Sequence, residues 1–138
     1  MHPPKIQEAI ESFKELNKME IYEQLVWHSK HLKEFPENAK TVENKVPGCI
    51  SEVYITARLE NGKIYFSGTS NAILVKGLVA LLIEGLNGLT SEQIQNVNPV
   101  FLQELGLTET LTPSRMNASY NILELMKKKA QSLKHRSK

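Results

Sequence analysis

The chain has 138 residues, of which 41% are hydrophobic and 23% charged, proportions typical of a globular domain rather than a disordered or fibrous chain. Its 17 basic and 15 acidic residues leave a net charge of +2, and basic residues are not interleaved with aromatic ones, so the composition does not indicate nucleic-acid binding. The length fits one domain with a single hydrophobic core, which we expect to occupy residues 1–138.

Cysteine usage and hydropathy indicate a reducing compartment. Cys49 is the only cysteine, so the chain cannot form an internal disulfide, whereas small secreted domains usually depend on such bonds. Residues 1–5 lack the apolar run of a signal peptide. The longest apolar stretch, residues 72–86, is too short to span a bilayer and contains Lys76 and Glu84. We therefore expect a cytoplasmic protein that does not insert into a membrane.

Two amphipathic helices are predicted in the first 35 residues. Apolar side chains recur at helical spacing after Pro3 and Pro4 and again over residues 18–33, so each helix turns one face toward the core. The second helix is expected to end before Phe35-Pro36, because proline restricts the residue before it. The side chains expected to point inward are Ile6, Ile10, Phe13 and Leu16 in the first helix, and Ile21, Leu25, Trp27 and Leu32 in the second.

A β-hairpin follows a polar segment over residues 37–45. Apolar and polar side chains alternate over residues 53–60, as in a half-buried strand. Asn61-Gly62 is the favoured two-residue hairpin turn, since both residues tolerate positive φ. Residues 63–69 are expected to return as the second strand, with Ile64 and Phe66 on one face.

Residues 72–86 predict a helix that is apolar on almost every side and therefore central and buried. Ser70 or Asn71 is expected to cap its first turn by accepting a backbone N–H. Gly77 indicates a close approach of another backbone, because glycine inside a helix costs about 1 kcal/mol relative to alanine. Asn87-Gly88 is expected to end the helix.

Three further helices are predicted after residue 88. Thr90 with Gln93 is typical of a capping box that opens a short helix. Another helix is expected from Asn98-Pro99 to Gly106, and the last from Thr112-Pro113 to about residue 133. The order of two helices, a hairpin and further helices predicts an α+β fold, with helices packed on a small antiparallel sheet.

Cys49 follows Val46-Pro47-Gly48, a sharp turn directly before the first strand. A loop tip can present the sulfur beside free backbone N–H groups, which favour an anion, and the thiolate is the reactive form of cysteine. A lone cysteine is nevertheless more often a small buried hydrophobic residue. The position of Cys49 by itself leaves both interpretations open.

The histidines do not complete a recognisable site with this thiol. A cysteine hydrolase needs a histidine base, but His2 and His135 lie near the ends of the chain and His28 and His31 share one helix. The spacing of these last two could suit a metal, for which only Cys49 and scattered carboxylates remain as further ligands. Phosphate-loop, dinucleotide and metalloprotease motifs do not occur. We therefore expect neither a metal nor an organic cofactor.

Two basic features allow more than one interpretation. Arg115 falls in the first turn of the last helix, where the helix dipole disfavours a cation, so it either contacts an acidic partner or pairs with a neighbouring carboxylate. A basic C-terminal run either contacts an anionic surface or forms a solvated helix end that the dipole favours, which is the simpler explanation. Its residues are Lys127, Lys128, Lys129, Lys134, His135, Arg136 and Lys138.

Three blocks of the sequence, taken together, resemble the SufE family of sulfur acceptors. The first is residues 46–54, VPGCISEVY, which is similar to the cysteine loop of that family. The second is residues 66–78, FSGTSNAILVKGL, where the strand passes into the buried helix. The third is residues 111–118, LTPSRMNA. Each block alone is weak, but the three in this order are specific, and the resemblance extends over residues 6–130.

The chain departs from the family pattern at four positions. Ile50 stands where the family usually has Gln, Tyr54 where it has Trp, Asn71 where it has Asp, and Ala118 where it often has Gly. None of these changes removes the thiol or Arg115. The change at Asn71 deletes a negative charge near the expected cysteine pocket, which would ease thiolate formation because a like charge disfavours ionisation.

The resemblance implies a function, a fold and partners. Cys49 would take persulfide sulfur from a PLP-dependent cysteine desulfurase of the SufS or CsdA type, stimulate that enzyme, and deliver the sulfur to an iron–sulfur scaffold complex such as SufBCD. The fold would resemble the IscU-type scaffolds, the cysteine would be sheltered in an apolar pocket, and the chain would be a monomer or weak homodimer. PLP would belong to the partner, so this chain would carry no cofactor. Partner contacts are expected from Gly48, Ser51, Ser70, Asn71 and Arg115.

Two other functions stay open beside this one. The chain could be a non-catalytic scaffold that binds iron or a nascent cluster, although such sites generally use several cysteine thiolates and one is present here. It could also be an autonomous thiol hydrolase, for which the missing base is unfavourable.

Overall fold

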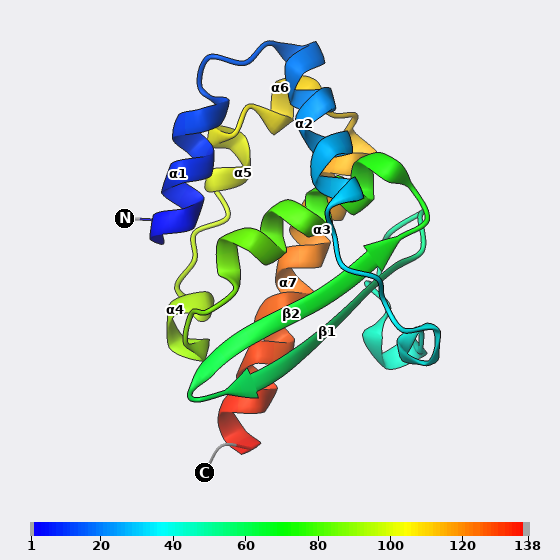
Figure 1. Ribbon diagram of the computed structural model, residues 1–138, viewed down its shortest axis with the longest axis vertical. Helices are drawn as coiled ribbons and strands as arrows, with labels where there is room; N and C mark the ends of the chain where they lie inside the picture. Colours follow the sequence, from blue (N-terminus) through cyan, green and yellow to red (C-terminus); the bar gives the residue numbers. More distant parts are fainter. Residues whose placement is uncertain (1, 137–138) are drawn as a thin grey trace.

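The computed structural model describes residues 2–136, with side chains through residue 134, and has an α+β architecture (Figure 1). Its elements are α1 (Pro4–Phe13), α2 (Lys18–Lys30), the 3-10 turns η1 (Glu37–Ala39) and η2 (Val42–Asn44), β1 (Val53–Glu60), β2 (Lys63–Ser70), α3 (Ile73–Leu86), α4 (Ser91–Gln95), α5 (Phe101–Glu104), α6 (Leu107–Thr110) and α7 (Pro113–Arg136). The two strands form an antiparallel sheet, with α3 packed against β2 and α7 against β1. Since α1 and α2 also pack on α3, that helix lies at the centre. The predicted fold class is confirmed.

The first two helices bury most of the side chains predicted to face inward. Ile6, Ile10 and Phe13 of α1 and Ile21 and Leu25 of α2 belong to the core. The N-terminus of α2 is fixed by a reciprocal capping box between the side chains and backbone N–H groups of residues 17 and 20. Capping of this kind satisfies two donors that a helix start would otherwise leave unpaired.

The predicted inward orientation of Trp27 is wrong. The side chain is 51% exposed and stacks on the ring of His31. Trp27 comes two residues after the buried Leu25, about 200° around the helix, so it faces the opposite side. The helix also ends at Lys30, three residues earlier than predicted.

The strands form the predicted hairpin around Asn61-Gly62, and β2 continues one residue beyond the predicted end, to Ser70. Val53 pairs with Ser70 at one end and Glu60 with Lys63 at the other. The turn residues Asn61 and Gly62 have φ values of +52° and +78°, as this two-residue turn requires. The buried side chains of the sheet are Val53, Ile55, Ile64 and Phe66.

The central helix α3 is buried as predicted, but its cap differs. Nine of its fourteen residues are buried. A Cβ at Gly77 would lie 2.3 Å from the carbonyl oxygen of Leu25, which confirms the close backbone approach. The helix begins after Ala72 without a side-chain cap, because Ser70 Oγ accepts a hydrogen bond from the Ala72 N–H at 3.2 Å and closes a turn before the helix instead. Asn71 is therefore not the cap either.

Beyond α3, the described chain has one helix more than predicted. The capping box of Thr90 and Gln93 opens α4 as expected. The segment from Asn98 to Gly106 contains only the short α5, and Gly106, with φ of +81°, leads directly into α6. No helix within residues 2–136 is both long enough and apolar enough to cross a membrane.

Two C-terminal lysines have structural contacts. Lys127 Nζ donates to the Val97 carbonyl and Lys129 Nζ to Asn44 Oδ1, each at 2.7 Å. They tie α7 to the loops around it and are more than a solvated helix end. The side chains of residues 135–138 lie outside the described part of the chain.

Candidate functional site

Cys49 lies in a short loop whose base is fixed. The N–H of Val46 donates to the carbonyl of Val53 at 2.8 Å, which closes residues 47–52 into a loop at the start of β1. Two bonds tie Glu52 to the β2–α3 connection: its N–H donates to Asn71 Oδ1 at 3.1 Å, and its carbonyl accepts from the Asn71 N–H at 3.2 Å. The tip that carries the cysteine therefore projects from an anchored base.

The tip directs the thiol and the next side chain to different environments. Gly48 has a φ of +76°, in the left-handed region that favours glycine. After this turn Cys49 is half-buried, whereas Ile50 is 92% exposed. The sulfur is thus partly sheltered, and an apolar side chain beside it faces solvent.

The thiol borders a small pocket of about 250 Å³ between the loop, α3 and the start of α7. The first turn of α7 supplies most of its polar groups, and its backbone N–H groups carry the positive end of the helix dipole, which favours an anion nearby. The residues that line this Cys49 pocket are Cys49, Ile50, Ser51, Val75, Thr112, Ser114, Arg115 and Ala118.

The burial of the Cys49 thiol disfavours its charged form. Burial raises the pKa of the Cys49 thiol, and a hydrogen bond from the Asn121 side chain opposes part of that rise. Arg115 is the one charged side chain lining the pocket in the described chain, and no carboxylate within residues 2–134 forms an ion pair with it. Because the thiolate is the nucleophilic form of cysteine, this burial lowers the reactivity of Cys49.

The residues predicted to contact a partner fall into two groups. Ser51 and Arg115 line the Cys49 pocket, and Gly48 forms the turn before the thiol. Ser70 and Asn71 do not line it. Asn71 instead anchors the loop base through its side-chain oxygen, a contact that the carboxylate usual at this position would also make.

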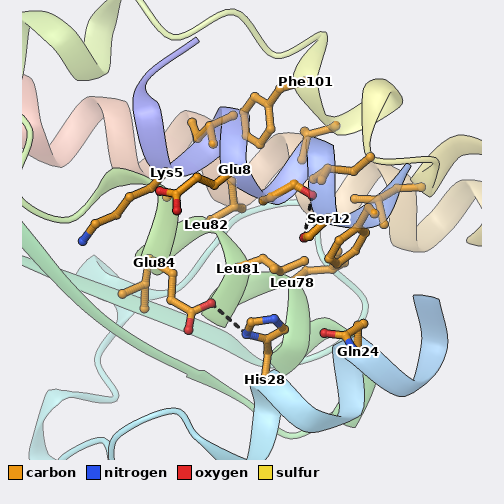
Figure 2. Close-up of a pocket in the computed structure, with 18 of the residues that line it drawn as sticks. Lys5, Glu8, Ser12, Gln24, His28, Leu78, Leu81, Leu82, Glu84 and Phe101 are labelled. Atoms are coloured by element: carbon orange, nitrogen blue, oxygen red, sulfur yellow. Dashed lines mark hydrogen bonds and ion pairs between the residues drawn. The ribbon is translucent and has the colours of Figure 1, made fainter. Parts of the chain in front are cut away.

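The three histidines whose side chains the structure describes do not line the Cys49 pocket. His28 Nδ1 is 2.7 Å from Glu84 Oε2, although outside hydrogen-bond geometry, at the edge of a separate cleft of about 660 Å³ between α1, α2 and α3 (Figure 2). His31 Nδ1 lies 2.8 Å from the Trp27 carbonyl, and His2 Nε2 lies 2.6 Å from a Glu104 oxygen. In the described chain no three His, Cys, Asp or Glu side chains gather as a metal site. These residues thus offer Cys49 neither a base nor metal ligands.

Val75, Thr112 and Ser114 line the pocket without having been predicted as site residues, and Asn121, which contacts the cysteine loop, lies outside all three blocks that resemble the family. The Asn121 side-chain nitrogen donates to the Gly48 carbonyl at 3.4 Å, across 73 positions of sequence. The contact exists because α7 packs along β1, and the cysteine loop leads directly into the start of this strand. The spacing of three residues between Asn121 and Ala118 was the available signal, since both then share a helix face.

The fold and the site together define a small α+β protein in which one thiol, carried by an anchored loop, rests half-buried against the start of a long helix. Residues 7–130 match the family model described as "SufE: Fe-S metabolism associated domain". The chain therefore belongs to the SufE family.

Relatives and a solved structure agree with this assignment. The chain is 50% identical over 129 residues to an uncharacterized SufE-like protein of Synechocystis sp., covering 93% of this chain and 81% of that protein. It is 35% identical over 96 residues to the sulfur acceptor protein CsdE of Escherichia coli, covering 68% of this chain and 65% of CsdE. Its fold resembles the solution structure of a hypothetical protein from Thermus thermophilus, with a TM-score of 0.82, 28% identity, and coverage of 96% and 97%.

Proposed function

We propose that this protein accepts sulfur from a cysteine desulfurase, carries it as a persulfide on Cys49, and delivers it for iron–sulfur cluster assembly. The observation that carries the proposal is the place of Cys49, half-buried at the tip of a loop with an anchored base, in a chain of the SufE family. The similarity to the sulfur acceptor CsdE supports the same role.

The transfer is an exchange at sulfur. The Cys49 thiolate attacks the outer sulfur of the persulfide on the desulfurase, the S–S bond of that persulfide breaks, and the partner's cysteine leaves as a thiolate. The new S–S bond joins Cys49 Sγ to the transferred sulfur, which keeps its proton. One S–S bond replaces another, so the step needs no external oxidant or reductant.

Docking has to activate the thiol. Because burial raises the pKa of Cys49, the free protein resists both alkylation and oxidation. A partner that draws the loop tip outward would relieve this burial and present the thiolate to the persulfide. Removal of the product sulfur would then stimulate the desulfurase.

The surface around the loop suits a partner with an apolar recess and an acidic edge. Ile50 and Ile73 are 92% and 62% exposed, and burying such side chains favours association. Arg115 adds a positive charge without a partner among the described carboxylates. Gly48 and Ser51 would contact the partner directly, whereas Ser70 and Asn71 would act by supporting the loop.

The proposal also covers the cofactor of the partner, the sulfur acceptor, the oligomeric state and the cellular compartment. PLP would stay with a desulfurase of the SufS or CsdA type, and the sulfur would pass to a scaffold complex of the SufBCD type. The carrier would act as a monomer or weak homodimer in the cytoplasm. A reducing compartment suits the mechanism because Cys49 must be a free thiol when it meets the persulfide.

Mass spectrometry tests the proposal. After incubation with a cysteine desulfurase, PLP and cysteine, we expect one added sulfur atom on Cys49 and faster turnover of the desulfurase. Cys49→Ser should keep its circular dichroism spectrum, gain no sulfur and give no acceleration. A serine variant that still stimulates fully would exclude the carrier mechanism, and a tightly held cluster after reconstitution with iron and sulfide would favour the scaffold function instead.

A further inference from the structure

A cleft of about 660 Å³, here called the helical cleft, lies between α1, α2 and α3 (Figure 2). None of the residues that line it also lines the Cys49 pocket. Its volume falls within the range of about 300–1,000 Å³ that is usual for small-molecule sites. The proposed sulfur transfer makes no use of this cleft, so its chemistry points to something else.

The floor of the helical cleft is apolar. Leu78, Leu81 and Leu82 of α3 line it, and Phe101 of α5 lies on the wall opposite His28 in Figure 2. Leu81 is only half-buried, although α3 is the central helix of the fold. Part of the apolar surface of this helix therefore stays open in the free protein, and covering it with an apolar ligand favours binding.

Carboxylates outnumber cations at the rim of the cleft. Glu8 of α1 and Glu84 of α3 are exposed side chains that line it, and Figure 2 shows both on the same side of the view. In the described chain, Lys5 is the one lysine or arginine among the lining residues. Within residues 2–134, neither Glu8 nor Lys5 forms an ion pair. With His28 neutral, the rim thus carries a net negative charge.

His28 leaves a polar atom unsatisfied at the same rim. Its Nδ1 is buried and has no hydrogen bond, although it lies 2.7 Å from Glu84 Oε2. Such atoms are rare in folded proteins and call for a cause. The Glu84 side chain is 54% exposed, and a carboxylate has about four acceptor sites. A small rotation would therefore let Glu84 serve both the Nδ1–H of His28 and a cationic donor in the cleft.

We propose that the helical cleft binds a small organic amine, whose ammonium group contacts Glu84 and Glu8 while its apolar body lies against the leucines of α3. Two glutamates would repel a carboxylate ligand, and an uncharged ligand would leave both without a partner. The inference goes beyond the proposed function, because it requires neither Cys49 nor a desulfurase.

Three probes with the same body and different head groups test the preference for an amine. They are 1-naphthylmethylamine, 1-naphthalenemethanol and 1-naphthoate, each titrated into the full ¹⁵N-labelled chain and followed by NMR. We expect shifts of the backbone amide signals of the residues that line the cleft. The amine should bind about twofold to fivefold more tightly than the alcohol, the scale of an exposed ion pair, and the naphthoate more weakly than the alcohol. The advantage of the amine should shrink at high salt.

Variants separate the charge of the rim from the shape of the cleft. Glu84→Gln and Glu8→Gln should each weaken the amine about twofold to fivefold and leave the alcohol unchanged. Glu23→Gln is the matched control, because Glu23 is exposed on α2 but does not line the cleft. Ala9→Leu, which narrows the cleft from α1, should weaken all three probes alike. Cys49→Ser should bind the amine as the wild type does.

Three results would overturn the proposal. The first is equal binding of the amine and the alcohol by the wild type, and the second is a set of shifted amides outside the cleft. The third is the lack of cleft shifts both with the naphthyl probes and with n-hexylamine, a slimmer body. These measurements need only the wild-type chain, so they decide the matter even where a variant does not fold. Failure here leaves sulfur transfer untouched, because no desulfurase takes part.

Discussion

Arg115 lies one turn before Ala118 on α7. Within the described chain, it is the only charged side chain that lines the Cys49 pocket. A cation in the first turn of a helix is opposed by the helix dipole, and the neighbouring carboxylate that could have explained it is absent from the ion pairs of residues 2–134. This position is therefore consistent with the proposed contact between Arg115 and an acidic group of the partner.

Arg115→Ala should weaken binding to the desulfurase about threefold to fivefold at low salt, the scale of an exposed ion pair. The loss should shrink at high salt, because screening already reduces the attraction in the wild type. Titration of the labelled protein at two ionic strengths measures both. Arg58→Ala is the control, since Arg58 already pairs with Glu60 at 3.2 Å and does not line the pocket. An unchanged affinity of Arg115→Ala at low salt would assign this arginine to local structure.

Among single residues, the sequence predicted the site correctly where a chemically reactive or charged side chain also lies in a block that resembles the family. Cys49 and Arg115 both lie in blocks that resemble the SufE family, and the structure places both at one pocket. Asn71 was expected beside the thiol but anchors the loop base instead. The contact of Asn121 with Gly48 joins residues 73 positions apart, and such a contact depends on how α7 packs on β1, which no local pattern encodes.

The close packing of α2 on α3 requires a glycine at position 77. Gly77 of α3 leaves room for the backbone of Leu25 in α2, with an imagined Cβ only 2.3 Å from the carbonyl oxygen. Backbone atoms cannot rotate away as a side chain can, so the two helices would have to separate.

Gly77→Ala is expected to lower the free energy of unfolding by about 3 kcal/mol, the upper range for overpacking a core. Gly85→Ala on the same helix is the matched control: its Cβ would meet only the side chain of Ile6, at 2.9 Å, and alanine favours a helix by about 1 kcal/mol, so the change should be nearly neutral. Urea denaturation followed by circular dichroism compares the two. Equal losses would show that the backbone contact is not what makes Gly77 necessary.

At the scale of elements, periodicity and turn chemistry predicted the hairpin and the long helices. Errors occurred where the signal was local and ambiguous. Trp27 is apolar, and its hydrophobicity alone suggested that it faces the core. Its angular position on the helix is opposite Leu25, so the side chain is exposed instead. Gly106 was interpreted as a helix end, yet its positive φ also forms the start of α6, because one left-handed residue can join two short helices.

The ionisation of Cys49 is coupled to the stability of the whole molecule. Burial raises the pKa of the thiol in the folded state, so the folded protein holds this proton more tightly than the unfolded chain does. The stability gained in this way is complete below the pKa of the unfolded thiol, about 8.5, and is lost as pH rises through the folded-state value.

The free energy of unfolding of the wild type should therefore fall relative to that of Cys49→Ser as pH rises above about 8.5. Below that value the difference between the two proteins should be constant. Urea denaturation of both at a series of pH values measures the difference and cancels the contribution of lysines and tyrosines common to them. A difference that stays flat or grows in alkaline solution would mean that the thiol is not protonated preferentially in the folded state.

The bond between Val46 and Val53 and the bonds between Glu52 and Asn71 set a limit on distance. Cys49 is three residues from Val46 and three from Glu52, and an extended chain spans at most about 3.5 Å per residue, so its Cα can lie only about 10 Å from the base of the loop and its sulfur one side-chain length farther. The loop that carries Cys49 is therefore short and anchored at both ends, and it cannot move the sulfur over a long distance. A donor must bring its persulfide, and an acceptor its receiving atom, within that reach, so geometry restricts the partners of this protein before any side chain is recognised.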